Sequence, residues 1–211
     1  MKLSILSAAL PFTVANLVVG EPTTTSTSPP ALPTDVLCTS YLQHKGNYGN
    51  HISNICAELI DHCIESARTR QDIWSINTCV AGATCQGTVV TTGLAKCFNL
   101  ALGNMNPRDF QSLNYNLYAS IVGGCAWQPG GCPITQQNYI DFFYGTLSPV
   151  NSNIWRSILV DSFLVLLICS SLSLQSEVIN LWWGSIKEWT NTGDTVPYIN
   201  FNDWLHYSNS L

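Results

Sequence analysis

Two cysteines, Cys56 and Cys63, lie seven residues apart on one face of an amphipathic segment, His51–Arg68. The apolar residues of this segment recur at intervals of three and four, as on one face of an α-helix. In a helix with a rise of 1.5 Å per residue, the two cysteines are roughly 10.5 Å apart. A disulfide requires Cα atoms within about 7 Å. Each cysteine must therefore bond to a different segment, so we expect this helix to be the centre of a cross-linked fold.

The remaining cysteines narrow the disulfide pattern. The chain contains nine cysteines, and such a density is typical of proteins from oxidising compartments. Cys169 lies in a continuous apolar segment, 157–175, that differs from the rest of the chain. Without it the cysteines form an even set of eight: Cys38, Cys56, Cys63, Cys79, Cys85, Cys97, Cys125 and Cys132. Eight cysteines allow roughly a hundred pairings. The turn-rich loop favours Cys125–Cys132. The two helix cysteines would then bond to two of the other four, and the last two would bond to each other.

Composition and motif searches argue against several functional classes. Only 10% of the residues are charged, the net charge is −5, and the basic residues are scattered, so we expect no nucleic-acid partner. The chain has no C-x2-C pair, and its histidines are not spaced as zinc ligands. It also lacks a nucleophile elbow, a glycine-rich phosphate loop and an H-E-x-x-H motif. We therefore expect neither a metal nor another cofactor.

The chain is predicted to have three parts. Residues 1–20 have a lysine, an apolar stretch and a small-residue end, as in a secretory signal peptide. Residues 21–34 form a Thr/Ser/Pro-rich flexible tail. Residues 35–211 form a cysteine-rich domain, which we expect to be extracellular.

Helical periodicity through this domain predicts an all-α, disulfide-stabilised bundle of about five to seven helices. Besides the cysteine-bearing helix, the segments with helical periodicity are 71–80, 89–102, 107–122, 136–147, 176–189 and 202–207. The second of these starts with TVVTT, which leaves a strand possible there.

Capping signals and one heptad pattern refine these helices. Predicted starts lie at Asn106-Pro107, Thr135 and Ser176, and predicted ends at Gly123-Gly124, Ser148-Pro149 and Asn191–Gly193. In 176–189, a seven-residue repeat predicts a buried seam of Ile179, Trp182, Ile186 and Trp189, with Trp183 outside it.

Residues 157–175 differ from their surroundings because their apolar residues are continuous rather than periodic. Three interpretations compete. A membrane span needs about 20 apolar residues, but Asp161 would be costly in lipid. A buried core helix is the second interpretation. The third is a translated retained intron, supported by residues typical of pyrimidine-rich codons and by the even cysteine count without Cys169. Sequencing the cDNA distinguishes the third from the others.

Acidic residues and one histidine supply the catalytic candidates. Asp203 and His206 are three residues apart, so they could meet on one helical turn as a general base. Asp141 could approach either Glu177 or Glu188 through folding. Glu177 and Glu188 would be about 16.5 Å apart on a helix, beyond the roughly 5–9.5 Å that separates glycosidase carboxylates.

Aromatic residues supply the binding candidates. Four of the seven tryptophans lie in the last thirty residues. Exposed rings bordered by amides bind sugars by stacking and hydrogen bonding, and the candidates are Trp127, Trp183, Trp204 and Tyr198. The alternative is that these rings are part of the core, because large aromatic side chains are mostly buried.

The segments CPITQQNYIDFFYGTLS and GDTVPYINFNDWLHYSNS resemble an uncharacterised family of secreted, cysteine-rich proteins of mushroom-forming fungi. The resemblance covers mainly Cys125–Leu211 without the apolar segment. It implies secretion and one disulfide-stabilised domain, and it carries no activity or catalytic residue.

We therefore expect a secreted, non-enzymatic protein that acts by surface, cell-wall or carbohydrate interaction. Its partner would be a glycan, a cell-wall component or a host-surface ligand, and membrane association is not expected. The alternative is a small extracellular hydrolase that uses Asp or Glu residues together with His206.

Overall fold

The computed structural model describes residues 36–45, 51–150 and 165–209, and for 51–54 and 165–176 it describes the backbone alone. The chain divides into two units, Met1–Leu32 and Pro33–Leu211, and all described residues belong to the second. The predicted signal peptide and the predicted Thr/Ser/Pro tail lie outside the described residues.

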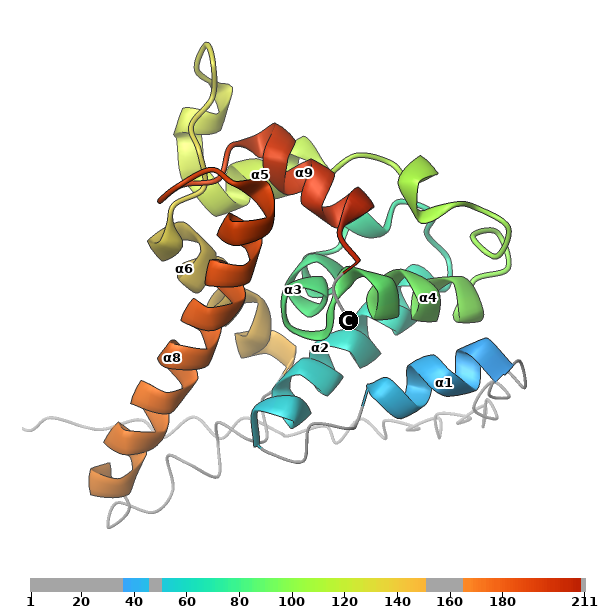
Figure 1. The fold of residues 1–211 in the computed structure, drawn as a ribbon, viewed down its shortest axis with the longest axis horizontal. Helices are drawn as coiled ribbons and strands as arrows, with labels where there is room; N and C mark the ends of the chain where they lie inside the picture. Colours follow the sequence, from blue (N-terminus) through green and yellow to red (C-terminus); the bar gives the residue numbers. More distant parts are fainter. Residues whose placement is uncertain (1–35, 46–50, 151–164, 210–211) are drawn as a thin grey trace, which may run out of the picture. The chain divides into compact units, whose positions relative to one another are not determined.

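The second unit is all-α, as predicted (Figure 1). Its described residues form eight α-helices: α1 Val36–His44, α2 His51–Ala67, α3 Asn77–Gln86, α4 Thr88–Phe98, α5 Tyr115–Val122, α6 Gln136–Val150, α8 Val165–Thr190 and α9 Tyr198–Tyr207. Three short 3-10 helices, η1 Ile73–Ser75, η2 Pro107–Asp109 and η3 Gly123–Trp127, join them. The strand left open at TVVTT does not form, since these residues begin α4.

Four disulfides cross-link the helices, and their pairing follows the predicted rule. Both cysteines of α2 bond to α3, in the pairs Cys56–Cys85 and Cys63–Cys79, with Cα–Cα distances of 6.0 and 4.6 Å. The earlier cysteine of α2 pairs with the later one of α3, so the two helices are antiparallel. The other bonds are Cys38–Cys97, between α1 and α4, and Cys125–Cys132. Helix α2 is thus the cross-link centre of the N-terminal half.

The core forms where α2 and α3 face each other. Leu59 and Ile60 of α2 are fully buried, as is Trp74 just before α3. A Cβ atom on Gly82 of α3 would lie 2.7 Å from the Ile60 Cδ1 atom. The glycine therefore allows a close approach that a larger residue would prevent.

The helix predicted at 107–122 is in fact two separate elements, so that prediction is wrong in its start. The side chain of Asn106 accepts a hydrogen bond from the Arg108 amide at 3.0 Å, but only the 3-10 helix η2 follows. Helix α5 begins later, where the side chain of Asn114 accepts from the Asn116 amide at 2.9 Å. The second cap satisfies the free amides of a new helix. Gly123, with φ +81°, ends α5 as predicted.

Two other helix ends differ from prediction. Helix α6 begins after Thr135, whose hydroxyl accepts a hydrogen bond from the Asn138 amide at 3.1 Å, as predicted. It continues through Pro149 to Val150. Helix α8 starts at Val165, so Ser176 is internal to the helix and is not its cap. Asn191 (φ 52°) and Gly193 (φ 74°) follow its end, as predicted.

The buried face of α8 is also different from the predicted seam. Trp183 is 1% exposed, whereas Trp189 is 45% exposed and Trp182 is half-buried. The buried positions Ile179, Trp183, Ile186 and Thr190 follow the 3.6-residue period of a straight helix. The predicted seam has the same seven-residue repeat but the opposite order of steps, three then four residues instead of four then three, so it selected the wrong tryptophans.

The interpretations of 157–175 remain predictions, because 157–164 and the side chains of 165–175 lie outside the described residues. Among the helices whose residues are described, none has both the length and the apolar character needed to cross a membrane.

Candidate functional site

Four aromatic side chains from three segments of the chain meet in an aromatic cluster: Tyr115, Tyr118, Trp127 and Tyr198. The ring of Tyr115 lies 5.0 Å from Trp127 and 5.4 Å from Tyr198, centroid to centroid, in edge-to-face geometry. The rings of Tyr118 and Tyr198 are 4.9 Å apart. Edge-to-face contacts of this kind stabilise the ring orientations.

Hydrogen bonds fix the three tyrosines of the cluster. The hydroxyl of Tyr115 donates to the Ala126 carbonyl, and that of Tyr118 donates to the Cys132 carbonyl. The hydroxyl of Tyr198 donates to the Leu113 carbonyl at 2.6 Å. Each ring is therefore held at both its apolar body and its polar tip, so the cluster is preorganised.

The cluster borders a cleft of about 600 Å³, which we call the aromatic cleft. Its lining residues are Tyr115, Tyr118, Gln128, Gly130, Gly131, Cys132, Pro133, Thr192, Thr195, Pro197, Tyr198 and Ile199. Trp127 stands next to this lining, against Tyr115, with 62% of its surface exposed. The lining contains three tyrosine rings, one side-chain amide and two threonine hydroxyls, and none of its residues is charged.

The disulfide loop Cys125–Cys132 forms one wall of the aromatic cleft. The two cysteines are seven positions apart in the sequence. Gly130 and Gly131 have φ angles of +87° and +61°, a conformation that favours glycine. The loop thus turns tightly enough to place Trp127 and Gln128 at the cleft.

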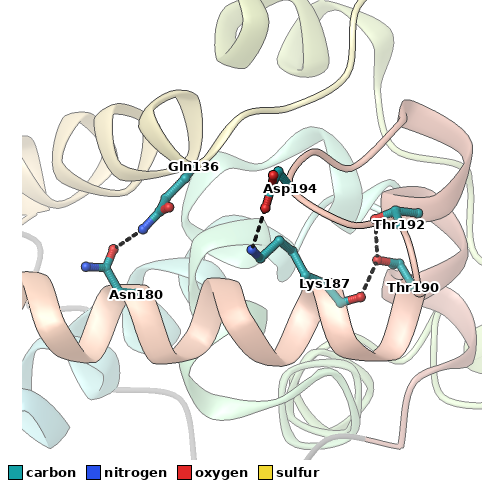
Figure 2. A network of polar contacts seen from close by, with 6 residues as sticks. All are labelled: Gln136, Asn180, Lys187, Thr190, Thr192 and Asp194. Carbon is teal, nitrogen blue, oxygen red and sulfur yellow. Dashed lines mark hydrogen bonds and ion pairs between the residues drawn. The ribbon is translucent and has the colours of Figure 1, made fainter.

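The segment after α8 forms the opposite wall, and polar contacts fix it (Figure 2). The hydroxyl of Thr190 donates to the Ile186 carbonyl at 2.8 Å and lies 2.9 Å from the Thr192 hydroxyl. Lys187 forms an ion pair with Asp194 at 3.8 Å.

A two-residue bridge joins the two walls. The amide of Ile134 donates to the Val196 carbonyl at 2.8 Å, and the amide of Val196 donates to the Ile134 carbonyl at 2.9 Å. The cleft is therefore bounded by segments that are tied to each other and to α8.

Of the four predicted binding residues, the structure brings two together. Trp127 and Tyr198 both belong to the aromatic cluster. Trp183 and Trp204 are buried, so their assignment as surface binding residues is wrong. Trp183 stacks on Tyr139, with centroids 5.3 Å apart, and Trp204 stacks on Phe201 at 5.7 Å.

Sequence reasoning missed two members of the site, Tyr115 and Tyr118. Tyr118 lies within the segment 107–122 that was predicted to be helical, and it is buried and lines the cleft. Tyr115 follows the cap residue Asn114, so recognising that cap would have identified its position at the start of a helix.

The catalytic candidates do not form a site. His206 is buried, with its Nδ1 atom 2.7 Å from the Asn202 carbonyl oxygen and its Nε2 atom 3.0 Å from that of Phe110. No hydrogen bond or ion pair links it to Asp203 among the described residues. The Oδ1 atom of Asp141 instead accepts from Gln137 at 2.8 Å.

The remaining carboxylates are also separate from the cleft. Glu177 and Glu188 are exposed on α8, and neither lines the aromatic cleft. Within residues 36–45, 51–150 and 165–209, no group of three or more His, Cys, Asp or Glu side chains is placed to hold a metal ion.

Comparisons with family models, with curated proteins and with solved structures find no match to this chain.

Burial of the cluster tyrosines has a measurable consequence. Burial raises the pKa of Tyr118. Burial also raises the pKa of Tyr198, and the neighbouring Tyr115 adds to this shift. Outside the cluster, the pKa of the fully buried Tyr139 is raised by burial as well. In an ultraviolet titration we expect these phenols to ionise above the ordinary value of about 10. Since the folded state binds their protons more tightly, the contribution of these phenols to the free energy of unfolding is fully present below about pH 10 and is lost as the pH rises above it.

The denatured protein is the control for this titration. All its tyrosines should ionise in one transition near the ordinary value of about 10. If the native and denatured proteins gave the same single transition, the tyrosines would not be buried as described.

Proposed function

We propose that this is an extracellular protein that binds carbohydrate in the aromatic cleft and does not cleave it. The observation that supports it best is the preorganised aromatic cluster beside a cleft whose polar groups are amide and hydroxyl. Tyrosine and tryptophan rings provide apolar faces for sugar C–H groups, while Gln128, Thr192 and Thr195 can bond to sugar hydroxyls. Four disulfides support an oxidising location for the protein.

The chemistry of the lining also favours binding over hydrolysis. Glycoside hydrolysis in most families requires two carboxyl groups on either side of the bond to be cleaved. The lining of the aromatic cleft contains neither Asp nor Glu. Uncharged hydrogen-bonding groups match the hydroxyls of neutral sugars, so we propose neutral oligosaccharides as the ligand class.

Binding to an array of neutral and acidic oligosaccharides, followed by calorimetry on the best ligand, tests this function. Tryptophan is enriched among the few contact residues whose truncation costs more than about 1 kcal/mol. We therefore expect Trp127→Ala to weaken binding about tenfold. Tyr198→Phe keeps the ring and removes the hydroxyl that bonds to Leu113, so it should retain most of the affinity.

Trp189→Ala is the matched control, because Trp189 is also an exposed tryptophan but does not line the cleft. It should bind like the unmodified protein. Equal losses in Trp127→Ala and Trp189→Ala, or no binding to any oligosaccharide, would contradict the proposal. Release of shorter sugars that stops in Asp203→Ala would instead support the hydrolase alternative.

A further inference from the structure

Some basic residues of this acidic protein form ion pairs with carboxylates, and others do not. The described residues include six lysines and arginines: Lys45, Arg68, Arg70, Lys96, Arg108 and Lys187. Three of them form ion pairs, with Asp61, Glu65 and Asp194 as the partners. Among described residues, the other three have no carboxylate partner, and two of these, Lys96 and Arg108, line one pocket.

This second pocket, which we call the basic pocket, has a volume of about 340 Å³. Its lining residues come from α1, α4, the region of η2, and the end of α9: Tyr41, Thr88, Val89, Thr92, Gly93, Lys96, Asn106, Pro107, Arg108, Leu205, His206, Tyr207, Ser208 and Asn209. The lining contains no Asp or Glu. It is a different site from the aromatic cleft, with which it shares no residue.

The two cations of the basic pocket come from different elements. Lys96 is in the last turn of α4, and Arg108 is in η2. The guanidinium of Arg108 lies 5.7 Å from the centre of the Tyr207 ring, a contact that stabilises the cation over the aromatic face. Tyr207 therefore places Arg108 at the pocket without neutralising its charge.

Buried hydrogen bonds join the elements that line the basic pocket. The hydroxyl of Thr88 donates to the Ser208 carbonyl at 2.9 Å, which joins the start of α4 to the end of α9. The His206 ring, through its Nε2 atom, lies 3.0 Å from the Phe110 carbonyl oxygen, which joins α9 to the chain that follows η2. The pocket is thus formed before a ligand arrives, which lowers the entropic cost of binding.

We propose that the basic pocket binds a compact oxyanion: a phosphate, sulfate or carboxylate group. Two cations that share a pocket without a carboxylate produce a local positive potential, which a bound anion relieves. Arginine and lysine both donate charge-assisted hydrogen bonds to such oxygens. Neutral hydrogen-bonding side chains such as Asn106 and Asn209 border the pocket and can complete the contacts.

Inorganic phosphate and sulfate are the first probes. They would be titrated against chloride at constant ionic strength, because exposed charges are screened by salt, and followed by amide NMR shifts. We expect saturable shifts at Lys96, Arg108 and Ser208. Lys96→Gln and Arg108→Gln should each weaken binding about tenfold, the range of a charge-assisted hydrogen bond.

Arg70→Gln is the matched control, since Arg70 also has no carboxylate partner among the described residues but lies outside the basic pocket. It should bind phosphate normally. Lys96→Arg keeps the charge and should retain binding, which separates loss of charge from loss of folding. Shifts that do not saturate, or equal weakening in Arg70→Gln, would overturn the proposal.

A second set of probes separates the two sources of an oxyanion. If the natural ligand is a free anion, inorganic phosphate or sulfate should bind at least as tightly as any larger molecule. If it is an acidic glycan, a sulfated or uronate oligosaccharide should bind more tightly than inorganic sulfate or acetate. Trp127→Ala should leave phosphate binding unchanged. If the protein binds phosphate but no neutral sugar, only the proposed function is contradicted. If it binds a neutral sugar but no phosphate, only the proposal for the basic pocket is contradicted.

Discussion

Trp183→Ala is expected to lower the free energy of unfolding by about 3–5 kcal/mol, the range for removing a buried tryptophan. The indole of Trp183 is 1% exposed and stacks on Tyr139. The hydroxyl of Tyr139 in turn donates to the Thr84 hydroxyl of α3 at 2.8 Å. Removing the indole therefore weakens the packing of α8 on α6 and, through Tyr139, the contact of α6 with α3. Chemical denaturation with fluorescence or circular dichroism measures it.

Trp189→Ala is the control, six residues further along the same helix. Trp189 is 45% exposed, and substitutions at exposed sites usually change stability by less than about 0.5 kcal/mol. The heptad seam predicted the opposite ranking, with Trp189 buried and Trp183 outside. The pair of variants thus decides between the two registers of α8. A larger loss for Trp189→Ala would contradict the structure.

Removing the Cys63–Cys79 disulfide is the second large perturbation. The double substitution Cys63→Ala/Cys79→Ala is expected to cost about 3 kcal/mol, because the bond closes a loop with a sequence separation of 16 residues. Both cysteines are buried, so alanine avoids leaving an unbonded polar group in the core. Urea denaturation of the purified variant under oxidising conditions measures the change.

Two other disulfides supply the comparison. The loop closed by Cys38–Cys97 is longer, with a separation of 59 residues, and its loss should cost about 4 kcal/mol. The separation in Cys125–Cys132 is 7 residues, and the expected cost is about 2 kcal/mol. The loop closed by this disulfide carries Trp127 and Gln128. Removing the disulfide should therefore weaken oligosaccharide binding, although its effect on stability is the smallest of the three. If removing Cys63–Cys79 left stability unchanged, α2 would not be the cross-link centre.

Local patterns in the sequence were sufficient for the all-α class and for the logic of the disulfides. The spacing of Cys56 and Cys63 excludes a bond between them, because helix geometry keeps them too far apart. The turn residues between Cys125 and Cys132 favour a closed loop. Both conclusions depend only on distances along the chain, and the structure confirms them.

Where neighbouring patterns competed, no local signal ranked one above the other. Asn106 and Asn114 are both good caps, and only the packing of the segment between them shows that the helix follows the second. The register of α8 is a similar case. Steps of three then four residues and steps of four then three both fit one helix face, but they select different tryptophans. The choice depends on which face meets Tyr139 and the rest of the core.

The sequence by itself determined an all-α, disulfide-linked domain and two members of the aromatic cluster, Trp127 and Tyr198. Only the tertiary structure decided which rings meet, which tryptophans are buried, and that Lys96 and Arg108 share a pocket. The physical reason is that helix period, capping and loop closure act over a few residues. The two pockets depend on contacts between segments that lie far apart in the chain, and their geometry follows from the packing of whole helices.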